Sequence, residues 1–154
     1  MTFNFKAEFL AVAAARRYFH GSSRAFQPGA ILGPGNLQSW GFSQEHEQIF
    51  EQARPSDKVP RIKCVFMCSR IQDVNQAGGG SLIYEVQPLG QVDVSDQAWY
   101  GMVGAPETGM GYTLKDPDTF DMVMNYWEGV PYPDKSESLW EYRTPSAKVL
   151  RRVK

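Results

Sequence analysis

Arg17-Tyr18-Phe19-His20-Gly21-Ser22-Ser23 is the stretch from which the fold and the candidate site are worked out. Its aromatic pair predicts the end of a buried strand. Gly21 lets the chain turn sharply or come close to a ligand. His20 is then expected at the strand end, where its two ring nitrogens are available for polar contacts. A core-edge histidine at an ordinary strand-to-turn junction is the alternative interpretation.

Length and charge narrow the class of protein. The chain has 154 residues, which suits a single domain over 1–154 with its own core. Its net charge of −1 argues against a general binder of long nucleic acid or of anionic membranes. The apolar run at residues 9–15 is too short to span a bilayer, and Arg16-Arg17 follow it instead of preceding it. We therefore expect a cytoplasmic protein.

The cysteines predict neither a disulfide nor a metal site. Cys64 and Cys68 are the only two, and on one strand they would lie about 13 Å apart. That separation is too large for a disulfide. Two cysteines and two distant histidines do not form a zinc-binding pattern. We expect buried, reduced thiols and no metal.

Local signals predict a mixed α+β fold. Asp116-Pro117 is a helix start and Gly129 a helix stop. Gly78-Gly79-Gly80 predicts a flexible joint; it lacks the P-loop pattern and precedes a strand. A long surface loop is expected over 100–115. Helices are expected over 6–16, 44–53 and 116–127, one or two helical turns over 70–76, and strands over 17–20, 62–68, 82–88, 91–94, 139–142 and 147–153.

Three motifs in order carry a resemblance to a known family. After Phe19–Ser23 come Phe26, Gly29, Leu32, Pro34 and Gly35; a strand follows at Val65–Cys68, and then Tyr84-Glu85-Val86-Gln87-Pro88-Leu89-Gly90. This order resembles the rifampin ADP-ribosyltransferases, which have a His-Gly-[Thr/Ser] strand end, a Leu-x-Pro-Gly turn and a Val-Glu-Pro-x-Gly strand and turn. Glu141-Tyr142-Arg143-Thr144 is similar to a late Tyr-Arg-Thr segment of that family.

The resemblance implies a fold and a cofactor. The fold would be ADP-ribosyltransferase-like, with split sheets of short strands and three flanking helices. NAD would bind as a substrate, with His20 holding a ribose hydroxyl and Gly21 approaching the nicotinamide amide. Ser22 or Ser23 would contact the cofactor. The strand tyrosine of the family falls on Phe66, which can stack on nicotinamide but lacks the hydroxyl.

The resemblance also implies a catalytic carboxylate. The nicotinamide–ribose bond breaks through an oxocarbenium-like state, which a nearby anion stabilises. The wider family places the acid at the start of a late strand, which indicates Glu141 as the first candidate. The rifampin-modifying enzymes place an aspartate soon after the Pro-x-Gly turn, which indicates Asp96 as the second, with Asp93 nearby. A solvent-facing strand residue is the alternative interpretation of Glu141.

We therefore expect an NAD-dependent mono-ADP-ribosyltransferase of bacterial or phage type. Its acceptor would be a protein side chain, a nucleobase or a small molecule, with a protein favoured. Two alternatives stay open on the same fold: an NAD glycohydrolase, in which water is the acceptor, and a non-catalytic binding or inhibitor module. A fourth alternative is an unrelated α+β protein that matches the motifs by chance.

Overall fold

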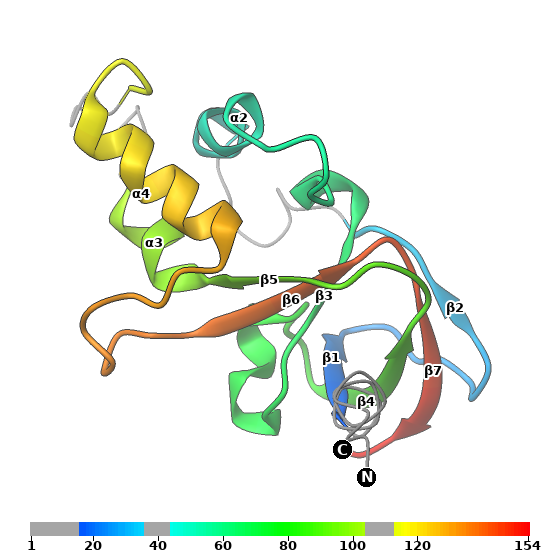
Figure 1. The fold of residues 1–154 in the computed structure, drawn as a ribbon. Coiled ribbons are helices and arrows are strands. Elements are labelled where there is room, and N and C mark those ends of the chain that lie inside the picture. Colours follow the sequence, from blue (N-terminus) through cyan, green and yellow to red (C-terminus); the bar gives the residue numbers. More distant parts are fainter. Residues whose placement is uncertain (1–15, 36–43, 104–112) are drawn as a thin grey trace, which may run out of the picture.

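Two antiparallel sheets organise the computed structural model, which describes residues 16–35, 44–103 and 113–154. The first sheet has the strand order β1-β4-β7-β2 and the second has the order β3-β6-β5. In Figure 1 the first sheet curls beside the second instead of continuing it. The strands are β1 Tyr18–Ser22, β2 Ile31–Leu32, β3 Val65–Met67, β4 Leu82–Pro88, β5 Asp93–Asp96, β6 Trp140–Thr144 and β7 Ala147–Arg152.

The two sheets are connected at two places. Phe19 of β1 and Cys68, just after β3, exchange both backbone hydrogen bonds, with N–O distances of 2.8 and 2.9 Å. At the other place β6 ends at Thr144 and β7 begins at Ala147, so the chain passes directly from the second sheet into the first. This arrangement sets the edge strands β1 and β3 side by side.

An apolar core lies between the sheets. Strand alternation directs Val65, Met67 and Tyr142 of the second sheet toward the first. Tyr84 and Val149 are among the residues of the first sheet that meet them. The opposite face of the second sheet carries Phe66 and the polar residues Ser95, Glu141 and Arg143. Helices cover that face.

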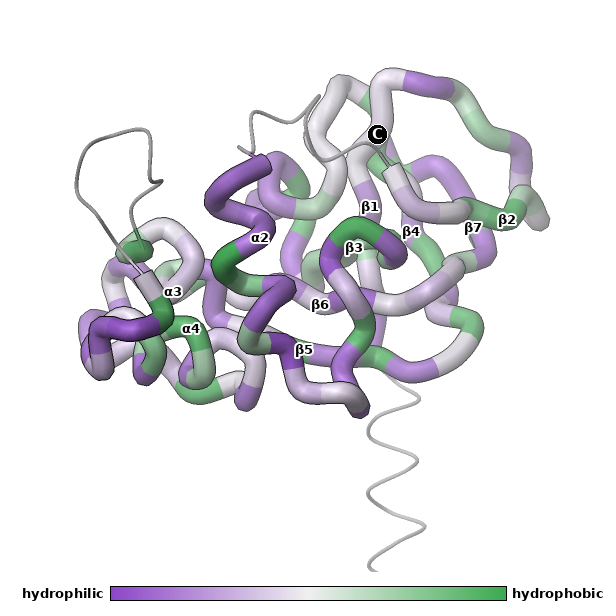
Figure 2. The backbone as a smooth tube through the Cα atoms, turned by 90° about the horizontal axis from the view of Figure 1, so that it is seen from above, coloured by the Kyte–Doolittle hydropathy of each residue, from purple (hydrophilic) through white to green (hydrophobic). Residues whose placement is uncertain are grey.

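The helical layer consists of α2 Gln44–Gln52, α3 Gln97–Met102 and α4 Pro117–Glu128. Figure 1 shows all three on the side of the second sheet that faces away from the first sheet. In Figure 2, α2 is largely hydrophilic and carries one short apolar segment. The buried apolar residues of α2 are Ile49 and Phe50. These two residues join aromatic side chains of α3 and α4 in a second core.

The ends of α4 follow from the sequence. Asp116 caps the helix by accepting a hydrogen bond from the Asp118 N–H, and Pro117 occupies the first turn. Gly129 ends the helix with a φ of 71°, in the left-handed region that glycine adopts without strain. The predicted helix over 116–127 is therefore confirmed.

The other predicted helices and strands agree in part with the elements of the structure. The expected strand over 82–88 is β4, and the expected helix over 44–53 is α2. The strand expected over 62–68 is shorter, because Arg61–Lys63 form a 3₁₀ turn, η2, before β3. The turns expected over 70–76 are a 3₁₀ helix, η3, at Ile71–Gln76.

The prediction of a long loop over 100–115 is wrong at its start, because α3 continues through Tyr100 and Gly101 to Met102. The helix expected over 6–16 lies almost wholly outside the described residues. The two cysteines are free and buried, as expected.

The mixture of helices with curled antiparallel sheets is compatible with the α+β class. In the described ranges, every helix falls short of the length and hydrophobicity that a bilayer crossing requires.

Candidate functional site

His20 lies on β1 opposite Tyr84 of β4, and its imidazole reaches toward β3. The His20 Nδ1 is 2.8 Å from the backbone carbonyl oxygen of Phe66. A carbonyl oxygen can only accept, so Nδ1 carries the proton and Nε2 presents a lone pair. Burial lowers the pKa of His20, and the hydrogen bond to Phe66 only partly opposes this. The ring is therefore neutral at pH 7.

A pocket of about 450 Å³ opens beside this imidazole, between β1, β2 and the first residue of β3. His20, Gly21, Ser22 and Ser23 all line it, so the structure brings together four of the residues singled out from the sequence. Leu32 and Val65 supply part of its apolar wall. The pocket therefore combines a neutral imidazole and two hydroxyls with an apolar surface.

Arg24 and Phe26 complete one side of the pocket. The guanidinium carbon of Arg24 lies 5.9 Å from the centre of the Phe26 ring. The Phe26 ring packs edge-on against Tyr84, whose hydroxyl accepts a hydrogen bond from the Phe26 N–H at 2.9 Å. Within the described ranges, Arg24 forms no ion pair with a carboxylate. Its charge is available to an anionic ligand.

A glycine-rich loop packs against the back of His20 and Gly21. A Cβ atom at Gly78 would lie 2.2 Å from the Gly21 carbonyl oxygen and 2.7 Å from His20 Cε1. A Cβ atom at Gly21 would lie 2.5 Å from the Gly79 carbonyl oxygen. The Gly21 N–H donates to the Ala77 carbonyl at 2.7 Å. The close backbone approach at Gly21 is therefore made by the chain's own loop.

Phe66 contributes its backbone, and not its ring, to the surroundings of His20. The Phe66 side chain is 1% exposed and packs with Val59 and Cys64 in a small core. The Arg61 guanidinium lies over the Phe66 ring at 4.9 Å. Alternation along β3 directs this ring toward the helical layer, away from the residues that line the His20 pocket.

Glu141 is buried inside an ionic network with Arg61 and Arg143 on the helical side of the second sheet. Its Oε1 accepts from Arg61 Nη1 at 2.8 Å and from Arg143 Nη1 at 3.0 Å. The Tyr126 hydroxyl donates to the same oxygen. Burial is the main cause of a raised pKa at Tyr126, so its phenol stays protonated and remains a donor. Glu141 is 1% exposed and does not line the His20 pocket.

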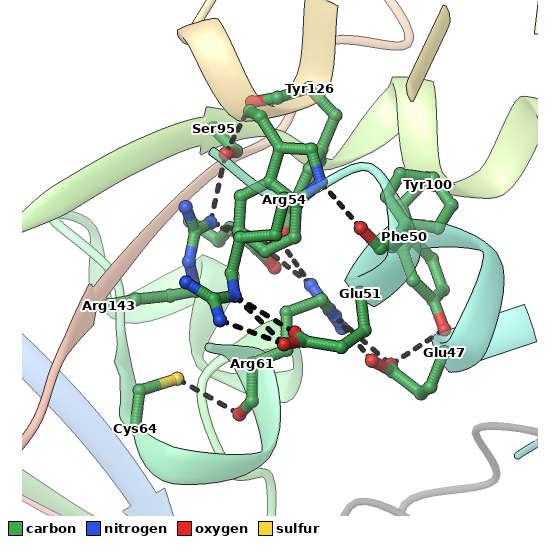
Figure 3. Close-up of polar contacts among 12 residues, drawn as sticks. Glu47, Phe50, Glu51, Arg54, Arg61, Cys64, Ser95, Tyr100, Tyr126 and Arg143 are labelled. Carbon is green, nitrogen blue, oxygen red and sulfur yellow. Dashed lines mark hydrogen bonds and ion pairs between the residues drawn. The ribbon is translucent and has the colours of Figure 1, made fainter. Parts of the chain in front are cut away.

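The same network ties α2 and α3 to the second sheet (Figure 3). Arg61 Nε donates to both carboxylate oxygens of Glu47 at 3.0 Å. The Tyr100 hydroxyl of α3 donates to Glu47 at 2.7 Å. Arg143 Nη1 reaches the Ser95 hydroxyl of β5 at 2.9 Å. Arg61 and Arg143 are thus paired with Glu47 and Glu141 inside the protein. These contacts indicate that Glu141 stabilises the fold.

Both carboxylate oxygens of Asp96 accept hydrogen bonds within the fold. Its carboxylate caps α3 by accepting from the Ala98 N–H at 3.1 Å. It also accepts from the backbone N–H groups of Tyr132 and Leu139 and from the Ser138 hydroxyl. Burial tends to raise the pKa of Asp96, but these hydrogen bonds outweigh it and leave the pKa below its usual value.

Asp93 is likewise buried away from the pocket, where its carboxylate accepts from the Val59 N–H and the Gln91 side chain. The structure therefore brings His20, Gly21, Ser22 and Ser23 together around one pocket. It places the Phe66 ring and the carboxylates of Glu141 and Asp96 outside that pocket. Sequence reasoning missed Arg24, which directly follows the opening motif, and named Phe26 only as part of the family resemblance and not as a site residue.

The described residues contain no group of His, Cys, Asp and Glu side chains placed to hold a metal ion. A scan against protein-family models finds no family that matches this chain, and a search of curated proteins finds no relative. The case for a function therefore rests on the pocket beside His20 and on the chemistry that its side chains can perform.

Proposed function

We propose that the protein binds NAD in the His20 pocket and acts on it as an ADP-ribosyltransferase, on an ADP-ribosyltransferase-like fold. Two lines support the proposal: the order of sequence motifs that resembles the rifampin ADP-ribosyltransferases, and the gathering of the opening motif around one pocket. A pair of sheets that meet along β1 and β3 is compatible with the split sheets that the resemblance implies.

The fixed tautomer of His20 is the observation that carries the proposal. Because Nδ1 donates to the Phe66 carbonyl, Nε2 can accept a hydrogen bond from a ligand hydroxyl. A ribose offers such hydroxyls, and Ser22 and Ser23 add polar contacts nearby. Arg24 supplies the positive charge that a pyrophosphate needs, and the Phe26 ring offers an apolar surface.

Transfer also needs an anion close to the ribose, because positive charge develops there as nicotinamide leaves. Glu141 and Asp96 are engaged in structural hydrogen bonds, and no described carboxylate lines the pocket. This observation favours a second candidate function, a non-catalytic module that binds the nucleotide without cleaving it. Both candidates share the same binding step, so binding is the first property to test.

The binding test uses calorimetry with NAD and a pair of variants. His20→Asn keeps an amide donor for the Phe66 carbonyl but removes the acceptor at Nε2, so we expect NAD binding to weaken at least tenfold. Arg24→Ala removes the positive charge at the pocket and should also weaken NAD binding. Arg152→Ala is its control and should leave NAD binding unchanged, because Arg152 is also exposed but does not line the pocket. Absence of saturable binding at millimolar NAD would contradict both candidate functions.

Product analysis then separates the functions. The protein is incubated with NAD labelled in its ADP-ribose part and with a cell lysate that offers protein, nucleic-acid and small-molecule acceptors. A labelled acceptor supports the transferase. Free ADP-ribose without a labelled acceptor indicates an NAD glycohydrolase. Binding without release of nicotinamide indicates the non-catalytic module.

A further inference from the structure

A second pocket lies between the segment that follows β3 and the start of β6. Its volume is about 570 Å³, and it shares no lining residue with the His20 pocket. One wall comes from the segment around Arg70 that leads into η3. The other wall comes from residues 131–138, which connect α4 to β6.

The first wall presents an ordered guanidinium. Arg70 donates to both oxygens of Asp73, with Nε–Oδ2 and Nη2–Oδ1 distances of 2.7 and 3.0 Å. This fork fixes the plane of the guanidinium and leaves Nη1 for another acceptor. Ser69, next to Arg70, adds a hydroxyl to the same wall.

The second wall presents Lys135 on a loop that is held in place. Asp96 accepts hydrogen bonds from the Tyr132 and Leu139 N–H groups, at 3.0 and 2.9 Å, and so fixes both ends of the loop. Asp134 accepts from the Ser136 N–H and hydroxyl within the loop. Lys135 forms no ion pair with any carboxylate in the described part of the chain.

Two half-buried aromatic residues, Trp140 and Tyr132, line the pocket between these walls. The Tyr132 ring is held edge-on against Trp99, with ring centres 4.8 Å apart. Within the described ranges, the Trp140 indole N–H and the Tyr132 hydroxyl form no side-chain hydrogen bond, and each offers one polar hydrogen to a ligand. The pocket thus combines cations, hydroxyls and flat apolar surface.

We propose that this pocket binds a small phosphate monoester that carries a sugar or aromatic ring. Arg70 and Lys135 contribute two positive charges and Asp73 one negative charge, which leaves a net +1 to meet the phosphate. Arg70 and Lys135 hold the phosphate from opposite walls, while the ring of the ligand lies against Trp140 and Tyr132. The proposal does not depend on NAD binding at His20.

The test is calorimetry on the full chain with AMP, ribose 5-phosphate and adenosine. We expect both phosphate esters to bind saturably and adenosine not to bind. Lys135→Ala is expected to weaken AMP binding about tenfold, whereas Lys115→Ala, which removes an exposed lysine that does not line the pocket, leaves it unchanged. His20→Asn should not alter AMP binding.

Three results would overturn the proposal. The first is that neither phosphate ester binds saturably at millimolar concentration. The second is that Lys115→Ala weakens binding as much as Lys135→Ala, which would indicate unspecific attraction. The third is that His20→Asn removes AMP binding while Lys135→Ala does not, which would assign the ligand to the His20 pocket. Thermal unfolding of each variant confirms that the tested protein is folded.

Discussion

At the scale of single residues, backbone groups orient the most important side chain of the candidate site. The His20 ring is held by the Phe66 carbonyl and backed by Gly78, and neither contact involves another side chain. The opening motif indicated where His20 would lie, because a strand end followed by glycine is a local signal. The directions of the Phe66 and Glu141 side chains depend on how β6 pairs with β3 and with β5, which the sequence of any one strand does not encode.

The pH dependence of NAD binding follows from the state of His20. Burial lowers the pKa of His20 below its ordinary value of 6.5, so the ring is neutral above that value in the free protein. Protonation converts Nε2 from an acceptor into a donor. We expect constant affinity between pH 7 and 8 and a loss of affinity as the pH falls through the lowered pKa. Calorimetry with NAD from pH 8 down through the lowered pKa measures this change in affinity. If the affinity of the wild type varied as little with pH as that of His20→Asn, the role of Nε2 would be contradicted.

Glu141→Gln tests whether Glu141 is structural. The change leaves Arg61 and Arg143 buried without their shared carboxylate, so we expect the free energy of unfolding to fall by about 3–5 kcal/mol. Urea titration measures the loss. Glu137→Gln is the control, because Glu137 is exposed, and should leave stability unchanged within error. A variant that keeps full stability yet loses ADP-ribosyl transfer would return Glu141 to a catalytic role.

At the scale of elements, the sequence predicts those that are defined by local signals. Both ends of α4 are marked by Asp116-Pro117 and Gly129, and alternation marks β4. α3 was missed because glycine at position 101 has low helix propensity. Tertiary contacts compensate: Asp96 caps α3, and Trp99 donates to the Val130 carbonyl at 2.8 Å.

Two glycines with different surroundings test the role of the glycine-rich loop. Gly78 has a φ of 99° and no room for a methyl group beside His20, so Gly78→Ala is expected to lower the free energy of unfolding by about 1–2 kcal/mol. It should also weaken ligand binding at His20. Gly101 lies in α3 with open space around it, so Gly101→Ala should stabilise the protein by about 0.5–1 kcal/mol. Urea denaturation of both variants measures the two changes in the free energy of unfolding. Equal changes would contradict the close packing of Gly78 against His20.

At the scale of the whole molecule, an ionic contact crosses three strands of the first sheet. Glu85 on β4 accepts from Arg17, which directly precedes β1, at 2.8 Å and from Arg151 on β7 at 2.7 Å. The hydrogen bonds from Arg17 and then Arg151 lower the pKa of Glu85 to about 2. This contact could not be predicted from the sequence, because residues 17, 85 and 151 meet only through the pairing of distant strands.

Acid titration of stability should reveal this contact. A carboxylate whose pKa is lowered in the folded protein stabilises the fold above its unfolded-state pKa, and this contribution is lost as pH falls toward the folded value. For Glu85 the expected window is from pH 4.5 down to about 2. The free energy of unfolding of Glu85→Gln should vary less with pH across this window than that of the wild type. If the free energies of unfolding of the wild type and of Glu85→Gln changed with pH in parallel, Glu85 would contribute nothing to the pH dependence of stability.

The contact between His20 and the carbonyl of residue 66 has an evolutionary consequence. A main-chain oxygen is present whatever amino acid is encoded there. Selection can therefore exchange tyrosine, phenylalanine or another large apolar residue at position 66 to suit the interior beneath the helices without disturbing the imidazole. Descendants of one ancestor would then diverge at this strand position while the histidine of β1 keeps its tautomer.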